Sequence, residues 1–216
     1  MHIPDGLLPL SQCIVYAASA LPFLAYSVPS VGRSAKRIAL ISSLTAIVFS
    51  ASAFSFPIVF GIRDHITLIP LAALIIGPTQ TTLAVFVALL GQALLFQEGG
   101  ITTLGANTLT MGVVAPFVTT LTYRLLAKNH SKSTKSLSIF LAGFGGVVSA
   151  ALATGTIVSL AVVAPSSAVM PEVGFFPSSL VIVSVVFYFV PVAVLEGFVT
   201  LAAKRIEADK LIAYWA

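Results

Sequence analysis

The amino-acid sequence predicts an all-α, polytopic membrane protein with about seven transmembrane helices, and three observations lead to this fold class. Of the 216 residues, 58% are hydrophobic and only 8% are charged. The mean hydropathy is +1.07, and a soluble globule of this length needs more polar side chains than that to cover its surface. The charged residues also leave long neutral runs whose apolar residues are continuous rather than alternating, which argues against a transmembrane β-barrel.

The neutral runs divide into seven expected helices. A helix needs about 20 apolar residues to cross a bilayer, and each run is at least that long. The third helix is the shortest, because Gly77 and Pro78 interrupt it early, so a tilted or partial helix is expected there. All seven form one domain, 1–216, which begins with an N-terminal arm at residues 1–9. Turn signals place the helices near residues 10–28, 37–57, 65–77, 79–97, 104–127, 137–163 and 179–203.

The basic residues predict the orientation of the chain. Lys and Arg near the ends of spans are retained on the cytoplasmic side of the membrane. With seven helices, ten of the eleven basic residues fall on one face, and only Arg63, next to Asp64, falls on the other. Merging the third and fourth helices would scatter the basic residues over both faces. The N-terminus is therefore expected outside, and the C-terminus is expected in the cytoplasm.

The N-terminal arm carries a candidate set of metal ligands. The α-amine of Met1, the amide nitrogen of His2 and its imidazole Nδ1 can close fused chelate rings on one ion. His65 is expected on the same outer face, and its nitrogen would complete a square-planar set that suits Ni(II) or Cu(II). Pro4 and Gly6 can stiffen and turn the arm so that it folds back into the bundle. The alternative is that both histidines are incidental, with His65 a hydrogen-bonded residue at the edge of a span.

Several segments resemble one known family. The resemblance is to the CbiM/NikM family, the substrate-binding components of energy-coupling-factor transporters for cobalt and nickel, and it extends over nearly the whole chain. The longest and most specific match is GQALLFQEGGITTLGANTLTMGVVAP, from Gly91 to Pro116. The other segments include MHIPDG at residues 1–6, FSFP at 54–57 leading to HIT at 65–67, and EGFVT at 196–200.

The resemblance implies the substrate and the residues that bind it. Ni(II) or Co(II) would be the transported substrate, with no organic cofactor. The ion would be held by the amine of Met1, by the backbone nitrogen and imidazole of His2, and by His65. Asn107 would support this site by hydrogen bonding, since metal-bound histidines need partners of their own. Asp64 would neutralise Arg63, a positive charge that departs from the family pattern near the histidine.

The resemblance also implies the partners. A transmembrane coupling (T) component and two cytoplasmic ATPase subunits are expected in the plasma membrane of a prokaryote, and a small accessory membrane subunit is a further partner that the family allows. The sequence itself contains no Gly-rich loop that ends in Gly-Lys-Ser/Thr, so ATP hydrolysis is expected on other subunits. The net charge of +4 is ordinary for a membrane protein with basic inner loops, so the lipid bilayer and not nucleic acid is the expected partner.

Two alternatives remain at this point. The first is a vitamin-binding subunit of the same architecture, in which the histidines would be incidental. The second is an intramembrane enzyme that uses Glu196 or a histidine as a base, but no nucleophile and base share a depth in the predicted spans. Acids within spans are usually functional. For Glu196 the sequence favours a structural partner, or coupling to a cytoplasmic-side subunit, over a proton relay.

Overall fold

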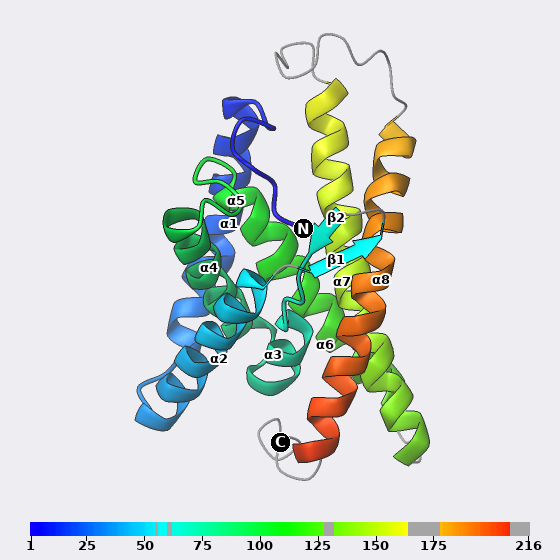
Figure 1. Cartoon of the computed structure of the whole chain (residues 1–216). Helices are drawn as coiled ribbons and strands as arrows, with labels where there is room; N and C mark the ends of the chain where they lie inside the picture. The colour runs from blue at the N-terminus through cyan, green and yellow to red at the C-terminus, as the bar shows by residue number, and fades with distance from the viewer. Residues whose placement is uncertain (55, 60–61, 128–131, 164–177, 208–216) are drawn as a thin grey trace.

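The structure is a bundle of helices with one small β-hairpin (Figure 1). The computed structural model describes residues 1–54, 56–59, 62–127, 132–163 and 178–207, with side chains described except at 56–59, 62–64, 132–134, 162–163, 178 and 204–207. The elements follow the chain as α1 (Leu10–Ser30), α2 (Ala35–Ala53), β1 (Phe56–Val59), β2 (Ile62–Asp64), α3 (Ile69–Ile76), α4 (Pro78–Leu95), α5 (Leu104–Asn107), the π-helical segment η1 (Thr108–Val114), α6 (Ala115–Leu126), α7 (Lys132–Val163) and α8 (Ser178–Glu207).

The predicted all-α membrane fold is confirmed. Among the described residues, six helical stretches are long and apolar enough to span a membrane: 10–30, 35–53, 78–95, 104–126, 135–161 and 179–203. The remaining predicted helix, the third at 65–77, corresponds to α3, which has only eight residues. Gly77, with φ +89°, separates α3 from α4, and Pro78 begins α4 because its fixed φ suits a first helical turn.

Two predicted helix boundaries are wrong, and prolines explain both. The third helix was expected from residue 65, but residues 65–68 have no regular secondary structure and α3 begins only at Ile69. Pro70 has no backbone N–H to bond the carbonyl of residue 66, so it fits the first turn of α3 and not the interior of a longer helix. The second helix was expected to reach residue 57, but it ends at Ala53, and β1 and β2 form an antiparallel hairpin beyond it. Pro57 has no backbone N–H and fits a strand edge better than a helix interior.

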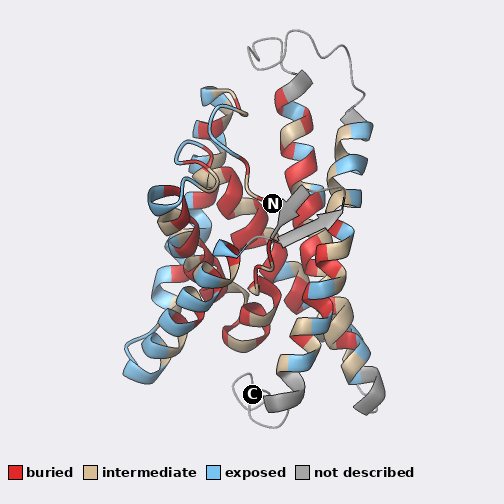
Figure 2. Ribbon diagram, in the orientation of Figure 1, coloured by how far each residue is buried: buried red, intermediate tan, exposed pale blue. Residues whose placement is uncertain are grey.

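The core lies where the helices converge (Figure 2). The helices α7 and α8 pack side by side, with α6 against α7, while α4 contacts both α1 and α2 on the other side (Figure 1). A Cβ on Gly143 of α7 would lie 3.0 Å from the Cα of Gly197 of α8, so small residues allow these two backbones to approach closely. The central cluster of buried side chains draws on most helices and also includes Met1 from the N-terminal arm.

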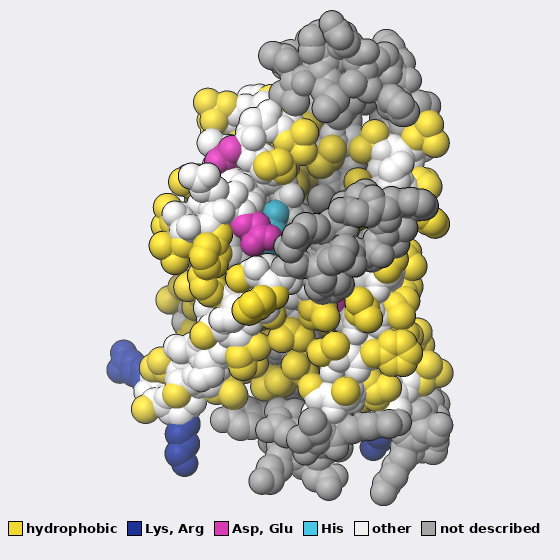
Figure 3. Space-filling model, viewed as in Figure 1, with side chains coloured by type: hydrophobic (Ala, Val, Ile, Leu, Met, Phe, Trp, Pro, Cys, Tyr) yellow, Lys and Arg dark blue, Asp and Glu magenta, His cyan; other side chains and the backbone are white. Residues whose placement is uncertain are grey.

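The described charges separate along the bundle. In the face shown in Figure 3, the Lys and Arg side chains lie at the lower end, and the visible histidine lies higher, next to acidic side chains. The basic residues belong to the α1–α2 connection, the end of α6 and the start of α7: Arg33, Lys36, Arg37, Arg124 and Lys135. This separation is the one that the predicted orientation requires. Which end faces the cytoplasm stays a prediction.

Candidate metal centre

The N-terminal arm, residues 1–9, runs into the bundle. The N-terminus lies among the helices near the hairpin (Figure 1). Met1 is 7% exposed and Ile3 is 1% exposed, so the first three residues are packed inside the protein. The arm then turns at Gly6, whose φ of +85° is a conformation that favours glycine, and α1 begins at Leu10. The chain therefore enters its own core before its first helix begins.

Two polar side chains fix the arm at Ile3. The amide oxygen of Asn107 accepts a hydrogen bond from the Ile3 backbone N–H at 2.8 Å, and its nitrogen donates to the Ile3 carbonyl at 3.0 Å. The Thr103 hydroxyl donates to the same carbonyl at 2.6 Å. All three groups are buried, so these bonds satisfy a backbone that has no helix or sheet to bond with. Asn107 thus supports the arm through Ile3, next to His2, and not through a histidine ring.

Asp5 forms a second anchor at the surface. Its carboxylate accepts hydrogen bonds from the Ile101 backbone N–H at 3.0 Å, the Thr102 N–H at 2.9 Å and the Thr102 hydroxyl at 2.6 Å. The hydroxyl contact is the main reason why the pKa of Asp5 lies below its ordinary value, with smaller contributions from the backbone donors. His2 is therefore held close to two fixed points, at Ile3 and Asp5.

The imidazole of His2 has its tautomer set by Gln92 on α4. Its Nε2 lies 3.0 Å from the Gln92 amide oxygen, and the amide nitrogen of Gln92 donates to the Phe49 carbonyl at 3.4 Å. An amide oxygen can only accept, so Nε2 carries the proton and Nδ1 keeps its lone pair. This is the ring nitrogen that can form a chelate ring with the backbone nitrogen of the same residue.

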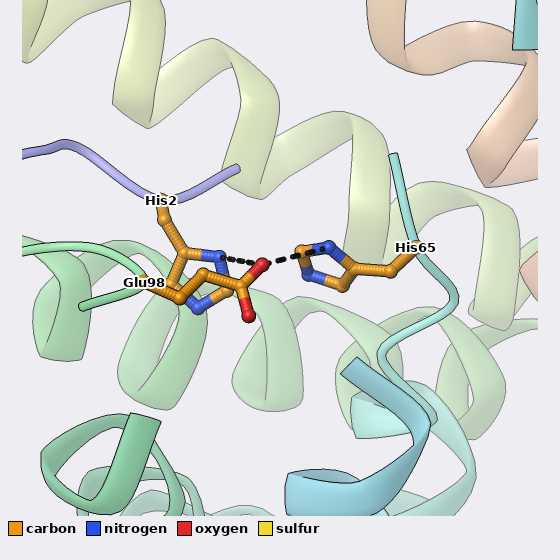
Figure 4. A group of neighbouring side chains, drawn as sticks. All are labelled: His2, His65 and Glu98. Atoms are coloured by element: carbon orange, nitrogen blue, oxygen red, sulfur yellow. Dashed lines mark ion pairs between the residues drawn. The ribbon is translucent and has the colours of Figure 1, made fainter. Parts of the chain in front are cut away.

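His65 and Glu98 meet His2 from two other parts of the chain (Figure 4). The ring centroids of the two histidines are 5.0 Å apart. The Glu98 Oε1 atom lies 3.3 Å from His65 Nδ1 and 3.8 Å from His2 Nδ1. One possible ligand atom from each of the three residues lies within 4.8 Å of the others. The contact with the carboxylate favours the His65 tautomer that is protonated on Nδ1, and this tautomer presents Nε2 as the metal-binding nitrogen.

Burial keeps both rings neutral. Burial, and secondarily the positive charge of the N-terminus, lowers the pKa of His65 to about 3. Burial, the N-terminal charge and the neighbouring His65 hold the pKa of His2 well below its ordinary value, and the hydrogen bond to Gln92 opposes them only in part. A metal ion binds the neutral form of imidazole. The two rings are therefore in the binding form throughout the neutral pH range.

A cavity of about 540 Å³ adjoins the two histidines. The arm, His65 and Glu98 form one wall, and Glu98 is about 29% exposed at its side chain. The opposite wall comes from α7 and α8, and it is mostly apolar: Thr154, Val158, Val185, Tyr188 and Phe189. The ring edges of His2 and His65 are thus reachable from a space that is larger than the ion itself.

The structure brings together three of the five residues singled out from the sequence, namely Met1, His2 and His65. Asn107 lies one hydrogen bond away from the arm. The side chain of Asp64 lies outside the described residues. Sequence reasoning missed two residues of the site, Gln92 and Glu98. The sequence did contain a signal for both residues. One is a glutamine within an apolar span and the other is an acid just beyond its end, and both lie in the segment with the most specific family match.

Comparison with known proteins identifies the family. Residues 2–206 match the family model described as CbiM, cobalt uptake substrate-specific transmembrane region. The chain belongs to the CbiM family. Among CbiM-family relatives, the cobalt transport protein CbiM of Kyrpidia tusciae is 36% identical over 204 residues, which cover 93% of this chain and 80% of that protein. A putative cobalt transport protein CbiM of Archaeoglobus fulgidus is 37% identical over 174 residues, which cover 78% of this chain and 76% of the relative.

Solved structures agree with this assignment. A crystal structure described as a truncated transition metal transporter superimposes on this CbiM-family chain with a TM-score of 0.81 and 29% identity, covering 96% of this chain and 99% of that one. Another, described as a transition metal transporter, gives a TM-score of 0.82 with 28% identity and covers 100% and 97% of the two chains. The predicted family resemblance is confirmed for CbiM. The chain is a multi-pass membrane component of metal uptake, and these comparisons lend no support to the enzyme or vitamin alternatives.

Proposed function

We propose that this CbiM-family protein captures Ni(II) or Co(II) as the transported substrate of an energy-coupling-factor transporter. The ligands are the α-amine of Met1, the amide nitrogen and Nδ1 of His2, and Nε2 of His65. The observation that carries the proposal is the convergence of two imidazoles from residues 63 positions apart in sequence, with side chains only 7% and 5% exposed and ring centroids 5.0 Å apart beside the N-terminus. Such a nitrogen-rich set suits late first-row transition ions and not Mg(II) or Ca(II).

The geometry favours each ligand for a separate reason. Gln92 holds the proton of His2 on Nε2 and leaves Nδ1 for the ion. Glu98 orients His65 and supplies a negative charge beside the cation. Met1 is packed in the core, and its α-amine is close enough for its charge to act on both rings. The site thus offers a chelate that is already folded, so little of the binding free energy is lost in ordering the arm.

Uptake by this subunit depends on other polypeptides. The sequence contains no phosphate-binding loop of the Gly-Lys-Ser/Thr type, so we assign ATP hydrolysis to two cytoplasmic ATPase subunits and force transmission to a transmembrane T component. A small accessory membrane subunit belongs to the same proposal. The metal site lies away from the basic end of the bundle, which supports an orientation with the N-terminus outside and the C-terminus in the cytoplasm of a prokaryotic cell.

An extension of the N-terminus tests this function. One glycine placed before Met1 turns the α-amine into an amide and removes it from the proposed site. Isothermal titration of the purified protein with Ni(II) and Co(II) should then show affinity reduced by about 100-fold or more, because losing a ligand costs more than losing a group that only orients one. One glycine added after Ala216 is the matched control and should leave binding unchanged. Equal affinity of both extended proteins would refute the amine ligand.

A further inference from the structure

The segment that carries His65 leads into α3 without regular secondary structure of its own. It comprises residues 65–68, between β2 and α3. Leu68, the residue before α3, adopts φ +56°, a conformation that a leucine adopts only when its surroundings hold it there, and its side chain does not cap the helix. The Ile69 N–H donates to the hydroxyl oxygen of Thr67 at 3.3 Å, whereas the N–H groups of Thr67 and Leu68 take a partner from a distant element.

Glu196 of α8 supplies that partner from 128 and 129 positions away in sequence. Its Oε1 atom accepts hydrogen bonds from the Thr67 backbone N–H, from the Thr67 hydroxyl at 2.7 Å and from the Leu68 N–H at 2.9 Å. Glu196 is fully buried within the span of α8. A carboxylate in such a position is costly unless its charge is matched, and two backbone donors, a hydroxyl and the positive end of α3 match it here.

The position of these contacts gives them a role beyond holding α8. Thr67 is only two residues after His65, so the carboxylate fixes the peptide groups that set the direction in which the His65 ring leaves the backbone. The His65 ring meets the His2 ring of the arm with centroids 5.0 Å apart, so the position of the His65 loop affects how the two rings meet. A displacement of about 1 Å in the residues that support a metal ligand is enough to take that ligand out of its binding geometry.

We infer that Glu196 is a positioning residue for His65: it binds the backbone of Thr67 and Leu68 and thereby holds the His65 ring against His2. The role of this ring as a metal ligand rests on the proposed function, whereas its placement by Glu196 does not. The same contact joins the metal site to α8, and α8 is packed along α7. Movement of the His65 loop is therefore transmitted directly to this helix pair.

The placement is tested in the metal-free protein. The chain has only three histidines, so labelling histidine with ¹⁵N gives three pairs of ring signals. Glu196→Leu removes the accepting oxygens at similar volume and should shift the His65 and His2 signals while the third histidine keeps its own. Thr200→Val is the matched control, because Thr200 is buried on α8 one turn later and its hydroxyl makes no hydrogen bond among the described residues. It should shift none of the three.

The consequence for binding is tested by a double-variant cycle with Co(II) titration. Glu196→Leu should weaken affinity by about 10- to 100-fold, the usual effect of losing a group that orients a metal ligand. The His65→Ala, Glu196→Leu double variant should bind within about threefold of His65→Ala alone, since a ring that is absent cannot be misplaced. Its visible Co(II) spectrum should match that of His65→Ala.

The outcomes separate this inference from the proposed function. A lower melting temperature for Glu196→Leu with unchanged ring signals and unchanged affinity would overturn the positioning role and leave only a structural one. If His65→Ala binds Co(II) as well as the wild type, the proposed ligand set fails, while shifted ring signals would still support the placement. If Glu196→Leu does not fold, Glu196→Gln and Thr67→Val replace it, and the loss of either contact must still shift the His65 ring for the inference to stand.

Discussion

Replacement of Asn107 by alanine tests how the arm is held. Asn107 forms two buried hydrogen bonds with Ile3, and alanine removes both. The Ile3 carbonyl keeps its bond from Thr103, but the Ile3 N–H loses its amide partner. A buried polar group left without a partner costs about 1–3 kcal/mol. Because each 1.4 kcal/mol is a factor of ten, docking of the arm should weaken by about 5- to 150-fold.

Metal affinity reports this loss, because only the docked arm presents the proposed chelate. Isothermal titration with Ni(II) should show weaker binding for Asn107→Ala, up to the full docking penalty. Hydrogen exchange should show faster exchange at residues 1–9 with no change in α7. Thr108→Val is the control, since its buried hydroxyl donates to the Leu104 carbonyl of the preceding helical turn and not to the arm. Wild-type affinity and wild-type exchange in a folded Asn107→Ala protein would refute the reasoning.

Two further predictions concern Gln92 and the pH dependence of stability. Gln92→Leu removes the contact that fixes the His2 tautomer and should weaken Co(II) affinity by about 10- to 100-fold in titration. Gln80→Leu is the control, because it removes a buried amide of the same helix that bonds the Ser30 carbonyl, and it should leave affinity unchanged. Equal losses in the two variants would refute the special role of Gln92. Because the pKa values of His2 and His65 are lowered in the folded protein, the unfolded chain binds protons at these rings at a higher pH. These rings should therefore not affect the stability of the metal-free protein above about pH 6.5, and its stability should fall as the pH drops from there toward 3. Thermal unfolding at several pH values checks this, and an equally steep fall after both histidines are changed to glutamine would contradict it.

The fold was largely predictable because lipid imposes a simple rule. A span has to be apolar over about 20 residues, so hydropathy alone located six of the helices. The short third helix was expected, but its start at Ile69 and the hairpin before it escaped prediction. Their backbone geometry follows from Pro57 and Pro70 and from contacts with distant residues, none of which leaves a periodic signal.

The candidate site was predictable in part, through chemistry rather than pattern. Met1 and His2 form a chelate from adjacent residues, so their joint role can be read from the sequence. His65 followed from its predicted depth together with the family resemblance. Gln92 could not be assigned in this way, because its contact with His2 spans 90 positions and depends on how α4 faces the arm. The same is true of Glu196, whose partner was expected but not identified.

The central claim is that the N-terminal arm and the His65 loop together bind one transition-metal ion. The most direct measurement is anomalous scattering at the Ni or Co absorption edge, from crystals of protein loaded with the ion at stoichiometric concentration. The account predicts a single strong peak within bonding distance of the Met1 amine, of His2 Nδ1 and of His65 Nε2. A peak elsewhere, or an ion bound while His2 and His65 stay apart, would contradict it.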